Sequence, residues 1–150
     1  MNQIRPWLYI GKYRDTTDLL LLEAHQIGAM LQLAELVEHP GITSLYLPVD
    51  DGVPLPYPML KKGVDFVKTQ KDQGRKVLVS CGAGISRSAT FAIAALKEIE
   101  GLNLSDAFRE INLHHRETLP HPALWKSLCD YFREEISYSK MLALRRATAS

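Results

Sequence analysis

The chain has 150 residues, 46% of them hydrophobic, which is enough to build one domain around a substantial core. Its formal net charge is only +1, so no nucleic-acid or membrane partner is expected, and its apolar runs fall short of the roughly 18 residues that a membrane-spanning helix needs. Two cysteines make no disulfide framework and the N-terminus lacks a signal-peptide pattern, which together indicate a cytoplasmic protein.

The first half of the chain alternates between strand-like and helical patterns. Each predicted strand is a short apolar run, and the helices follow capping residues or a proline-rich loop. Gly28 is expected to end the first helix. In chain order the prediction is an edge strand at 4–11, a helix at 19–24 capped from within 15–18, strands at 29–33 and 44–49, a loop at 50–58 and a helix at 59–73.

The second half is mainly helical. In order, the predicted elements are a buried strand at 77–79 and helices at 87–100, 105–116 and 121–138. Ser105 is expected to cap its helix, and the basic stretch 139–150 is expected to fray. Strands that alternate with helices, followed by a helical end, predict an α/β sandwich with a central, largely parallel sheet flanked by helices.

The segment richest in chemistry lies between the predicted strand 77–79 and the helix 87–100. It is a short loop with Cys81 at one end, two glycines inside and Arg87 at the other end. A strand, a glycine loop and a helix N-terminus make an anion site, because backbone N–H groups turn inward and the helix dipole adds positive partial charge. Such surroundings favour the nucleophilic thiolate, while the guanidinium fork grips two phosphoryl oxygens. The loop therefore predicts a bound phosphate ester that faces Cys81.

The run CGAGISRS, from Cys81 to Ser88, resembles the Cys-X5-Arg-Ser/Thr signature of the protein tyrosine phosphatase superfamily, and its full form resembles the dual-specificity branch. Further similar segments are IRPWLYIG at 4–11, YLPVDD at 46–51 and LPHPALW at 119–125. The resemblance implies a catalytic domain at 1–138 and leaves a basic tail at 139–150. One position departs from the family: Ser80 stands where relatives have a histidine that orders the loop.

The resemblance also implies a role for each part of the loop. Cys81 corresponds to the nucleophile, and the hydroxyl of Ser88 helps its sulfur leave again. The implied phosphate-binding residues are Gly82, Ala83, Gly84, Ile85, Ser86 and Arg87. Because the loop and Arg87 supply the positive charge, neither a metal nor another cofactor is expected. Relatives that act on inositol phospholipids usually carry basic residues inside this loop, so the absence of lysine from it disfavours such a substrate.

The departing oxygen of a phosphate ester needs a proton, which a carboxylic acid on a closing loop supplies. Asp50 and Asp51 both follow the predicted strand 44–49, and the Val-X-Asp pattern of the family favours Asp51. Arg116 lies where some relatives carry a basic residue for a second substrate phosphate. An arginine near a helix C-terminus is an equally simple explanation of Arg116.

The remaining candidates are five histidines and the second cysteine. The histidines show no metal-ligand spacing and are expected at the surface or its boundary, whereas Cys129 is expected to be buried. The whole pattern predicts a cysteine-dependent phosphatase for phosphorylated proteins, acting on phosphotyrosine, phosphoserine and phosphothreonine. The alternative is a catalytically weak module that binds phosphorylated partners, and Ser80 is the feature that favours it. The sequence leaves the oligomeric state open.

Overall fold

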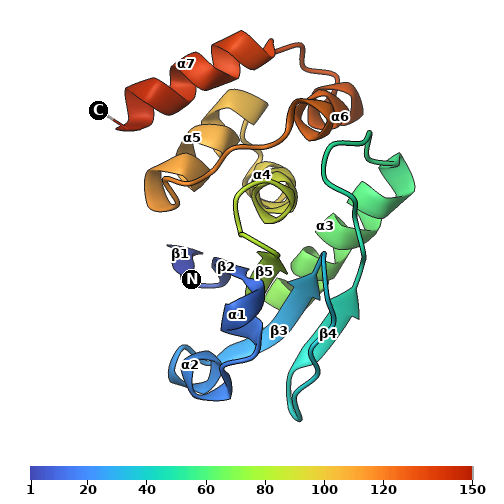
Figure 1. Ribbon diagram of the computed structural model, residues 1–150, viewed down its shortest axis with the longest axis vertical. Coiled ribbons are helices and arrows are strands. Elements are labelled where there is room, and N and C mark those ends of the chain that lie inside the picture. The colour runs from blue at the N-terminus through green and yellow to red at the C-terminus, as the bar shows by residue number, and fades with distance from the viewer. Residues whose placement is uncertain (150) are drawn as a thin grey trace.

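A five-stranded sheet runs through the computed structural model, which describes residues 1–149 (Figure 1). The strands are β1 (Asn2–Arg5), β2 (Leu8–Lys12), β3 (Ile27–Gln32), β4 (Thr43–Tyr46) and β5 (Lys76–Cys81). Their order across the sheet is β1-β2-β5-β3-β4. Only the β1–β2 pairing is antiparallel, so the predicted largely parallel sheet is confirmed.

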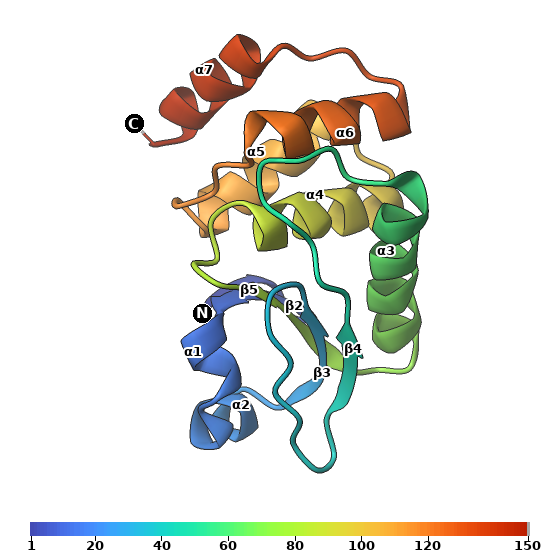
Figure 2. The ribbon, with the colours of Figure 1, turned by 45° about the vertical axis from the view of Figure 1, so that its right-hand side comes forward.

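Helices cover both faces of this sheet unequally (Figure 2). Two short helices, α1 (Tyr13–Thr16) and α2 (Leu19–Ala24), lie on one side. The other side carries α3 (Tyr57–Asp72), α4 (Arg87–Glu100), α5 (Leu104–His114), α6 (Pro122–Phe132) and α7 (Tyr138–Ala149). Of these, α3 and α4 pack on the central strands, while α6 packs on α4 and α7 packs on α5. No helix within residues 1–149 combines the length and the apolarity needed to cross a bilayer.

Alternation along β5 determines where the side chain of Cys81 lies. Val77 and Val79 belong to the large core between the sheet and α3–α6, whereas Leu78 belongs to a small cluster with Leu22 of α2. Cys81 continues the first series and is the last residue of the strand. The central strand therefore delivers a thiol to the carboxyl edge of the sheet, the edge where ligands bind in open α/β folds.

Two N-terminal predictions were wrong. Residues 4–11 form parts of two strands, β1 and β2, because the chain turns back at Pro6, whose ring fixes φ and removes a donor. Gly28 does not end α2, since the chain already leaves the helix at His25 and Gln26 takes a left-handed φ of 57°. Gly28 instead lies inside β3.

The C-terminal helices also differ from the prediction. The helix expected at 121–138 ends at Phe132, where Arg133 adopts a left-handed conformation with φ 56°. Residues 139–149, expected to fray, form most of α7, because Met141 is fully buried in the main core; residue 150 lies outside the described part. Asn103 rather than Ser105 caps α5, accepting a hydrogen bond from Asp106 N. Whether residues 1–138 suffice as a catalytic domain stays a prediction.

Gly63 provides a test of how α3 packs against α4. A Cβ atom on Gly63 would collide with the ring of Phe91, which is itself 1% exposed. In an open helix the change from glycine to alanine stabilises by about 1 kcal/mol, but overpacking a tight core costs about 1–3 kcal/mol. We therefore expect Gly63→Ala to lower the free energy of unfolding in urea, whereas Lys62→Ala on the exposed face should change it little. In a Phe91→Leu background the penalty should shrink, and a Gly63→Ala protein more stable than wild type would contradict this packing.

Candidate active site

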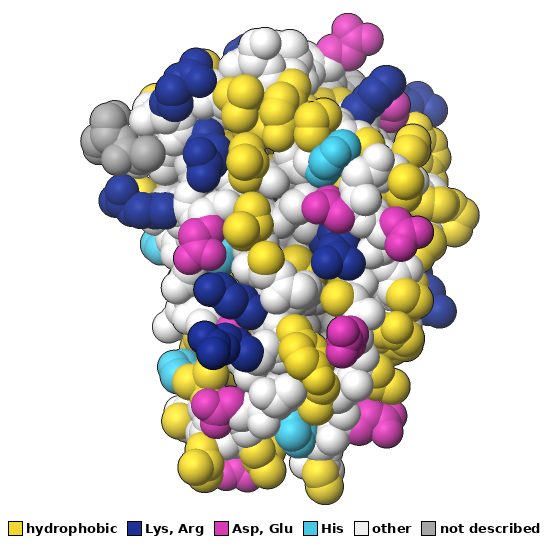
Figure 3. Space-filling view, in the orientation of Figure 1, with side chains coloured by type: hydrophobic (Ala, Val, Ile, Leu, Met, Phe, Trp, Pro, Cys, Tyr) yellow, Lys and Arg dark blue, Asp and Glu magenta, His cyan; other side chains and the backbone are white. Residues whose placement is uncertain are grey.

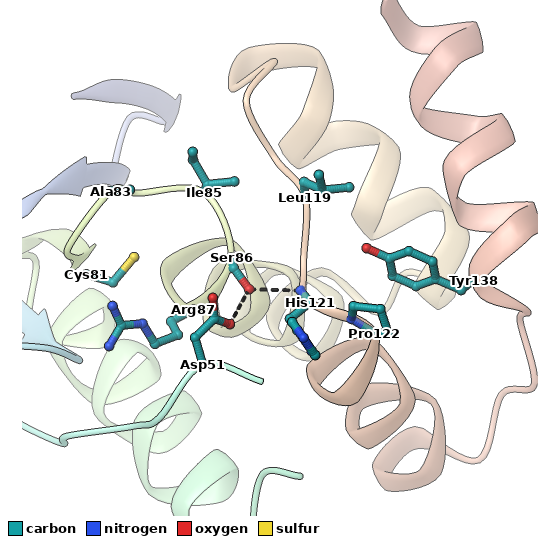
Figure 4. Close-up of a pocket in the computed structure, with 10 residues that line it drawn as sticks. All are labelled: Asp51, Cys81, Ala83, Ile85, Ser86, Arg87, Leu119, His121, Pro122 and Tyr138. Atoms are coloured by element: carbon teal, nitrogen blue, oxygen red, sulfur yellow. Dashed lines mark hydrogen bonds between the residues drawn. The ribbon is translucent and has the colours of Figure 1, made fainter. Parts of the chain in front are cut away.

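The loop between β5 and α4 closes around the sulfur of Cys81 (Figure 4). Cys81 is 3% exposed, and its Sγ atom accepts a hydrogen bond from Gly84 N at 3.2 Å. The same sulfur lies 3.3 Å from the hydroxyl oxygen of Ser88, which is fully buried in the first turn of α4. One amide of the loop and one hydroxyl of the helix thus lie within hydrogen-bond distance of the sulfur.

Gly84 is required at its position for two reasons. Its φ is +73°, a conformation that residues with a side chain rarely adopt. A Cβ atom there would also lie 3.0 Å from the carbonyl oxygen of Gly11 at the end of β2. The glycine therefore lets the loop curl tightly beside β2 and present its amide to Cys81.

Arg87 is the first residue of α4, and its guanidinium lies beside Cys81 in the close-up (Figure 4). Its Nη1 atom donates a hydrogen bond to the carbonyl oxygen of Val49 at 3.0 Å. This bond fixes the plane of the guanidinium and links it to the segment that carries the acidic candidates. A planar guanidinium held in this way is suited to grip two oxygens of a phosphoryl group.

Ser86 joins the loop to two other segments. It occupies the N-cap position of α4, yet its hydroxyl makes no capping bond. The hydroxyl instead donates to Asp51 Oδ1 at 2.8 Å and accepts a hydrogen bond from His121 N at 2.8 Å, as Figure 4 shows. The uncapped first turn of α4 remains available to an anion.

One cavity of about 350 Å³ brings the predicted reactive residues together. Its lining comprises Asp51, Cys81, Ala83, Ile85, Ser86, Arg87, Leu119, His121, Pro122 and Tyr138. Asp50 lines a different cavity with Val49 and the neighbouring prolines. Of the two acidic candidates, the structure thus places Asp51 beside Cys81.

On the face shown in Figure 3, an acidic, a basic and a histidine side chain lie side by side near the centre, bordered by hydrophobic ones.

Four residues of this cavity were not predicted from the sequence. Two lie just before α6, one is the first residue of α6 and one is the first residue of α7: Leu119, His121, Pro122 and Tyr138. The Tyr138 hydroxyl donates to Pro120 O at 2.7 Å. Burial raises the pKa of the Tyr138 phenol; the nearby Asp51 carboxylate raises it further, and Arg145 lowers it. Because the net pKa shift is upward, the phenol stays protonated and can donate this hydrogen bond. The proline-led segment at 119–125 was the sequence signal closest to these residues.

Other candidates lie elsewhere. Arg116 is not part of the cavity lining as described, and its carbonyl accepts hydrogen bonds from Asn112 and Arg145. Cys129 is buried as predicted, and burial raises the pKa of its thiol, so it stays protonated at neutral pH. The expectation that the histidines are surface or boundary residues was wrong for His115, which is 3% exposed. Residues 1–149 contain no cluster of three or more His, Cys, Asp or Glu that could hold a metal.

Comparison with known proteins connects this geometry to one family. A sequence model of the family described as "Dual specificity phosphatase, catalytic domain" matches residues 8–134. Human dual specificity protein phosphatase 16 is 34% identical over 135 residues, which are 87% of this chain and 20% of that protein, so the chain spans about a fifth of this relative's length.

Two solved structures share the fold over most of the chain. The human tyrosine phosphatase-like serine/threonine/tyrosine-interacting protein superposes with a TM-score of 0.81 at 26% identity, covering 89% of this chain and 95% of the other. DUSP15 superposes with a TM-score of 0.79 at 27% identity, covering 98% of this chain and 93% of the other. The two superpositions cover 89% and 98% of this chain, so the likeness concerns nearly the whole fold.

Proposed function

The chain belongs to the dual specificity phosphatase family, and from the geometry of its cavity we propose that it hydrolyses phosphotyrosine, phosphoserine and phosphothreonine on proteins through a phosphocysteine. The observation that carries the proposal is that one cavity joins Cys81, Arg87 and Asp51. These residues come from the end of β5, the start of α4 and the loop after β4. A thiol, a guanidinium and a carboxyl group around one cavity suit a nucleophile, a phosphate holder and an acid.

In the first step the thiolate of Cys81 attacks phosphorus in line with the departing oxygen. The S–P bond forms as the P–O ester bond breaks, and Asp51 gives its proton to the departing oxygen. Arg87 and the loop amides hold the three remaining phosphoryl oxygens. The hydrogen bond from Ser86 to Asp51 supports this assignment, because it fixes the carboxyl group beside the loop.

In the second step water attacks the phosphocysteine. Asp51, now a carboxylate, takes a proton from the water as the new P–O bond forms. The S–P bond breaks, orthophosphate leaves and the electron pair returns to sulfur. Gly84 N and the Ser88 hydroxyl lie close enough to stabilise the thiolate that departs.

The walls of the cavity bear on the substrate class. Ile85, Leu119, Pro122 and Tyr138 make its sides largely apolar, and its volume is about 350 Å³. Apolar walls accept the ring of phosphotyrosine, and the open mouth also admits the short side chains of phosphoserine and phosphothreonine. The proposed partner is therefore a phosphorylated protein segment laid across the mouth of the cavity.

We expect the purified protein to hydrolyse p-nitrophenyl phosphate with EDTA present, because Arg87 and the loop amides supply the charge that a metal would otherwise supply. Release of phosphate from matched phosphotyrosine and phosphoserine peptides measures its preference among substrates. Turnover of phosphotyrosine alone would narrow the class. Absence of turnover at every pH, combined with tight binding of a phosphopeptide, would replace the enzyme by the binding module that Ser80 favours.

A further inference from the structure

The outer side of the loop that follows Cys81 is held at three carbonyl groups by donors from other segments. Two of the donors are backbone N–H groups, and one is a histidine side chain. The bonds run from Tyr13 N to Gly82 O (3.2 Å), from His115 Nε2 to Gly84 O (2.5 Å) and from Leu119 N to Ile85 O (3.0 Å). The loop is therefore shaped from outside as well as by its own glycines.

Holding a carbonyl from outside also orients an amide. In a planar trans peptide the C=O and the N–H point in opposite directions. The carbonyl of Gly84 shares its peptide group with the N–H of Ile85. Because His115 holds that carbonyl on the outer side of the curled loop, the N–H of Ile85 turns toward the inner side, where a phosphoryl oxygen binds.

His115 is itself held firmly in place. It follows α5, its backbone N–H donates to Ile111 O at 2.8 Å, and its side chain is buried. Gly84 O can only accept, so Nε2 of the ring carries the hydrogen. The other nitrogen, Nδ1, lies 2.6 Å from Asn2 Nδ2 and accepts from it. Both ring nitrogens thus have hydrogen-bond partners, which fixes the orientation of the ring.

We propose that His115 is a positioning residue of the phosphate-binding loop, whose Nε2–H holds the Gly84 carbonyl outward so that the Ile85 amide faces the bound phosphoryl group. Its catalytic consequence rests on the proposed function, whereas its consequence for anion binding does not. Among the three outer bonds, this is the one that a substitution can remove without altering the backbone. The contribution of the loop amide can therefore be measured through a residue 31 positions away.

The test compares four variants. His115→Leu removes the donor, and His115→Asn keeps a polar group near Asn2 but is too short to reach Gly84 O. His115→Gln keeps a nitrogen donor at the distance of Nε2. His114→Leu is the matched control, because its side chain is 41% exposed and lies one residue away. Melting temperatures report on folding, and the Asn variant carries the test if the Leu variant does not fold.

The readouts are the dissociation constant for orthophosphate by calorimetry, and kcat and KM for p-nitrophenyl phosphate. We expect the Leu and Asn variants to bind orthophosphate roughly tenfold more weakly, as for one misdirected hydrogen bond to a charged group, and to lose kcat/KM by a similar factor. For the Gln variant, both the dissociation constant and kcat/KM should stay within about threefold of the wild-type values. The His114→Leu control should have wild-type values of both.

The outcomes separate the two proposals. Wild-type anion affinity in the Leu and Asn variants, or no rescue by Gln, would overturn the role of His115 even if the protein is an active phosphatase. A wild-type protein that binds orthophosphate but hydrolyses nothing would overturn the proposed function. The orthophosphate affinities of the four variants would then still test the role of His115. A wild type that binds no orthophosphate would overturn both.

Discussion

Replacing Cys81 by serine should abolish hydrolysis of p-nitrophenyl phosphate, lowering kcat by a factor on the order of ten thousand or more. A hydroxyl is a weak nucleophile unless a base takes its proton. Within residues 1–149, the sulfur of Cys81 has hydrogen-bond contacts with Gly84 N and Ser88 Oγ. Neither group is a base that could take the proton of a serine hydroxyl at position 81, so that hydroxyl would remain a poor nucleophile.

Controls for the Cys81→Ser variant follow from the same geometry. Orthophosphate should still bind, because Arg87 and the loop amides are unchanged. Cys129→Ser should keep near-wild-type activity, since Cys129 lies in α6 and does not line the cavity with Cys81. Residual turnover above about one percent in Cys81→Ser, with metal chelated, would point to a different nucleophile.

Replacing Asp51 by asparagine should lower kcat about a hundredfold to ten-thousandfold for a phosphoserine peptide. The alkoxide released from phosphoserine is a strong base that must be protonated as it departs. The loss should be smaller for p-nitrophenyl phosphate, whose phenolate is stable without a proton. Asparagine keeps an oxygen for the hydrogen bond from Ser86, so the loop geometry is preserved.

Asp50→Asn is the matched control for the acid, because the same change is made one residue away. Asp50 lines a separate cavity, so its substitution should alter kcat by less than about threefold. Steady-state rates for both variants on both substrates, over a range of pH, decide the assignment. A larger loss in Asp50→Asn than in Asp51→Asn would make Asp50 the acid.

Local patterns carried most of the information about the loop. The apolar run of β5, the two glycines and the good helix formers of α4 lie within one stretch of sequence, so the strand, turn and helix could be predicted together. Asp50 and Asp51 were both candidates because they follow a predicted strand, and the Val-X-Asp pattern of the family favoured Asp51. In each case the relevant neighbours in space are also near in sequence or attached to a predicted strand end.

His115 and Tyr138 could not be predicted in this way. His115 lies in the polar run LHHRE, which is typical of a surface, but α5 packs on β1 and the side chain of His115 lies between Asn2 and the loop at Gly84. Tyr138 extends the apolar pattern of α6, so the sequence did not indicate that this helix ends before Arg133. Both positions depend on tertiary contacts that leave no periodic signal.

The C-terminal helix was missed for a related reason. Its sequence is rich in Arg and Lys, which suggests a solvated tail, and Met141 is its one fully buried side chain in the described part of the chain. Arg145 does not extend into solvent but donates through Nε to Thr118 O at 2.8 Å. A basic residue that satisfies a backbone carbonyl looks the same in sequence as one that faces water.

The outer bonds on the loop also have a consequence for biosynthesis. One comes from Tyr13, others come from the segment after α5, and that segment is in turn held by Tyr138 and Arg145 of α7. A ribosome makes these parts in order, and Cys81 emerges well before the last of them. A nascent chain that ends before α7 thus has the thiol of Cys81 but lacks the hydrogen bonds from α7 that hold the segment after α5. Any activity of the proposed site should therefore appear only once the last described helix has docked.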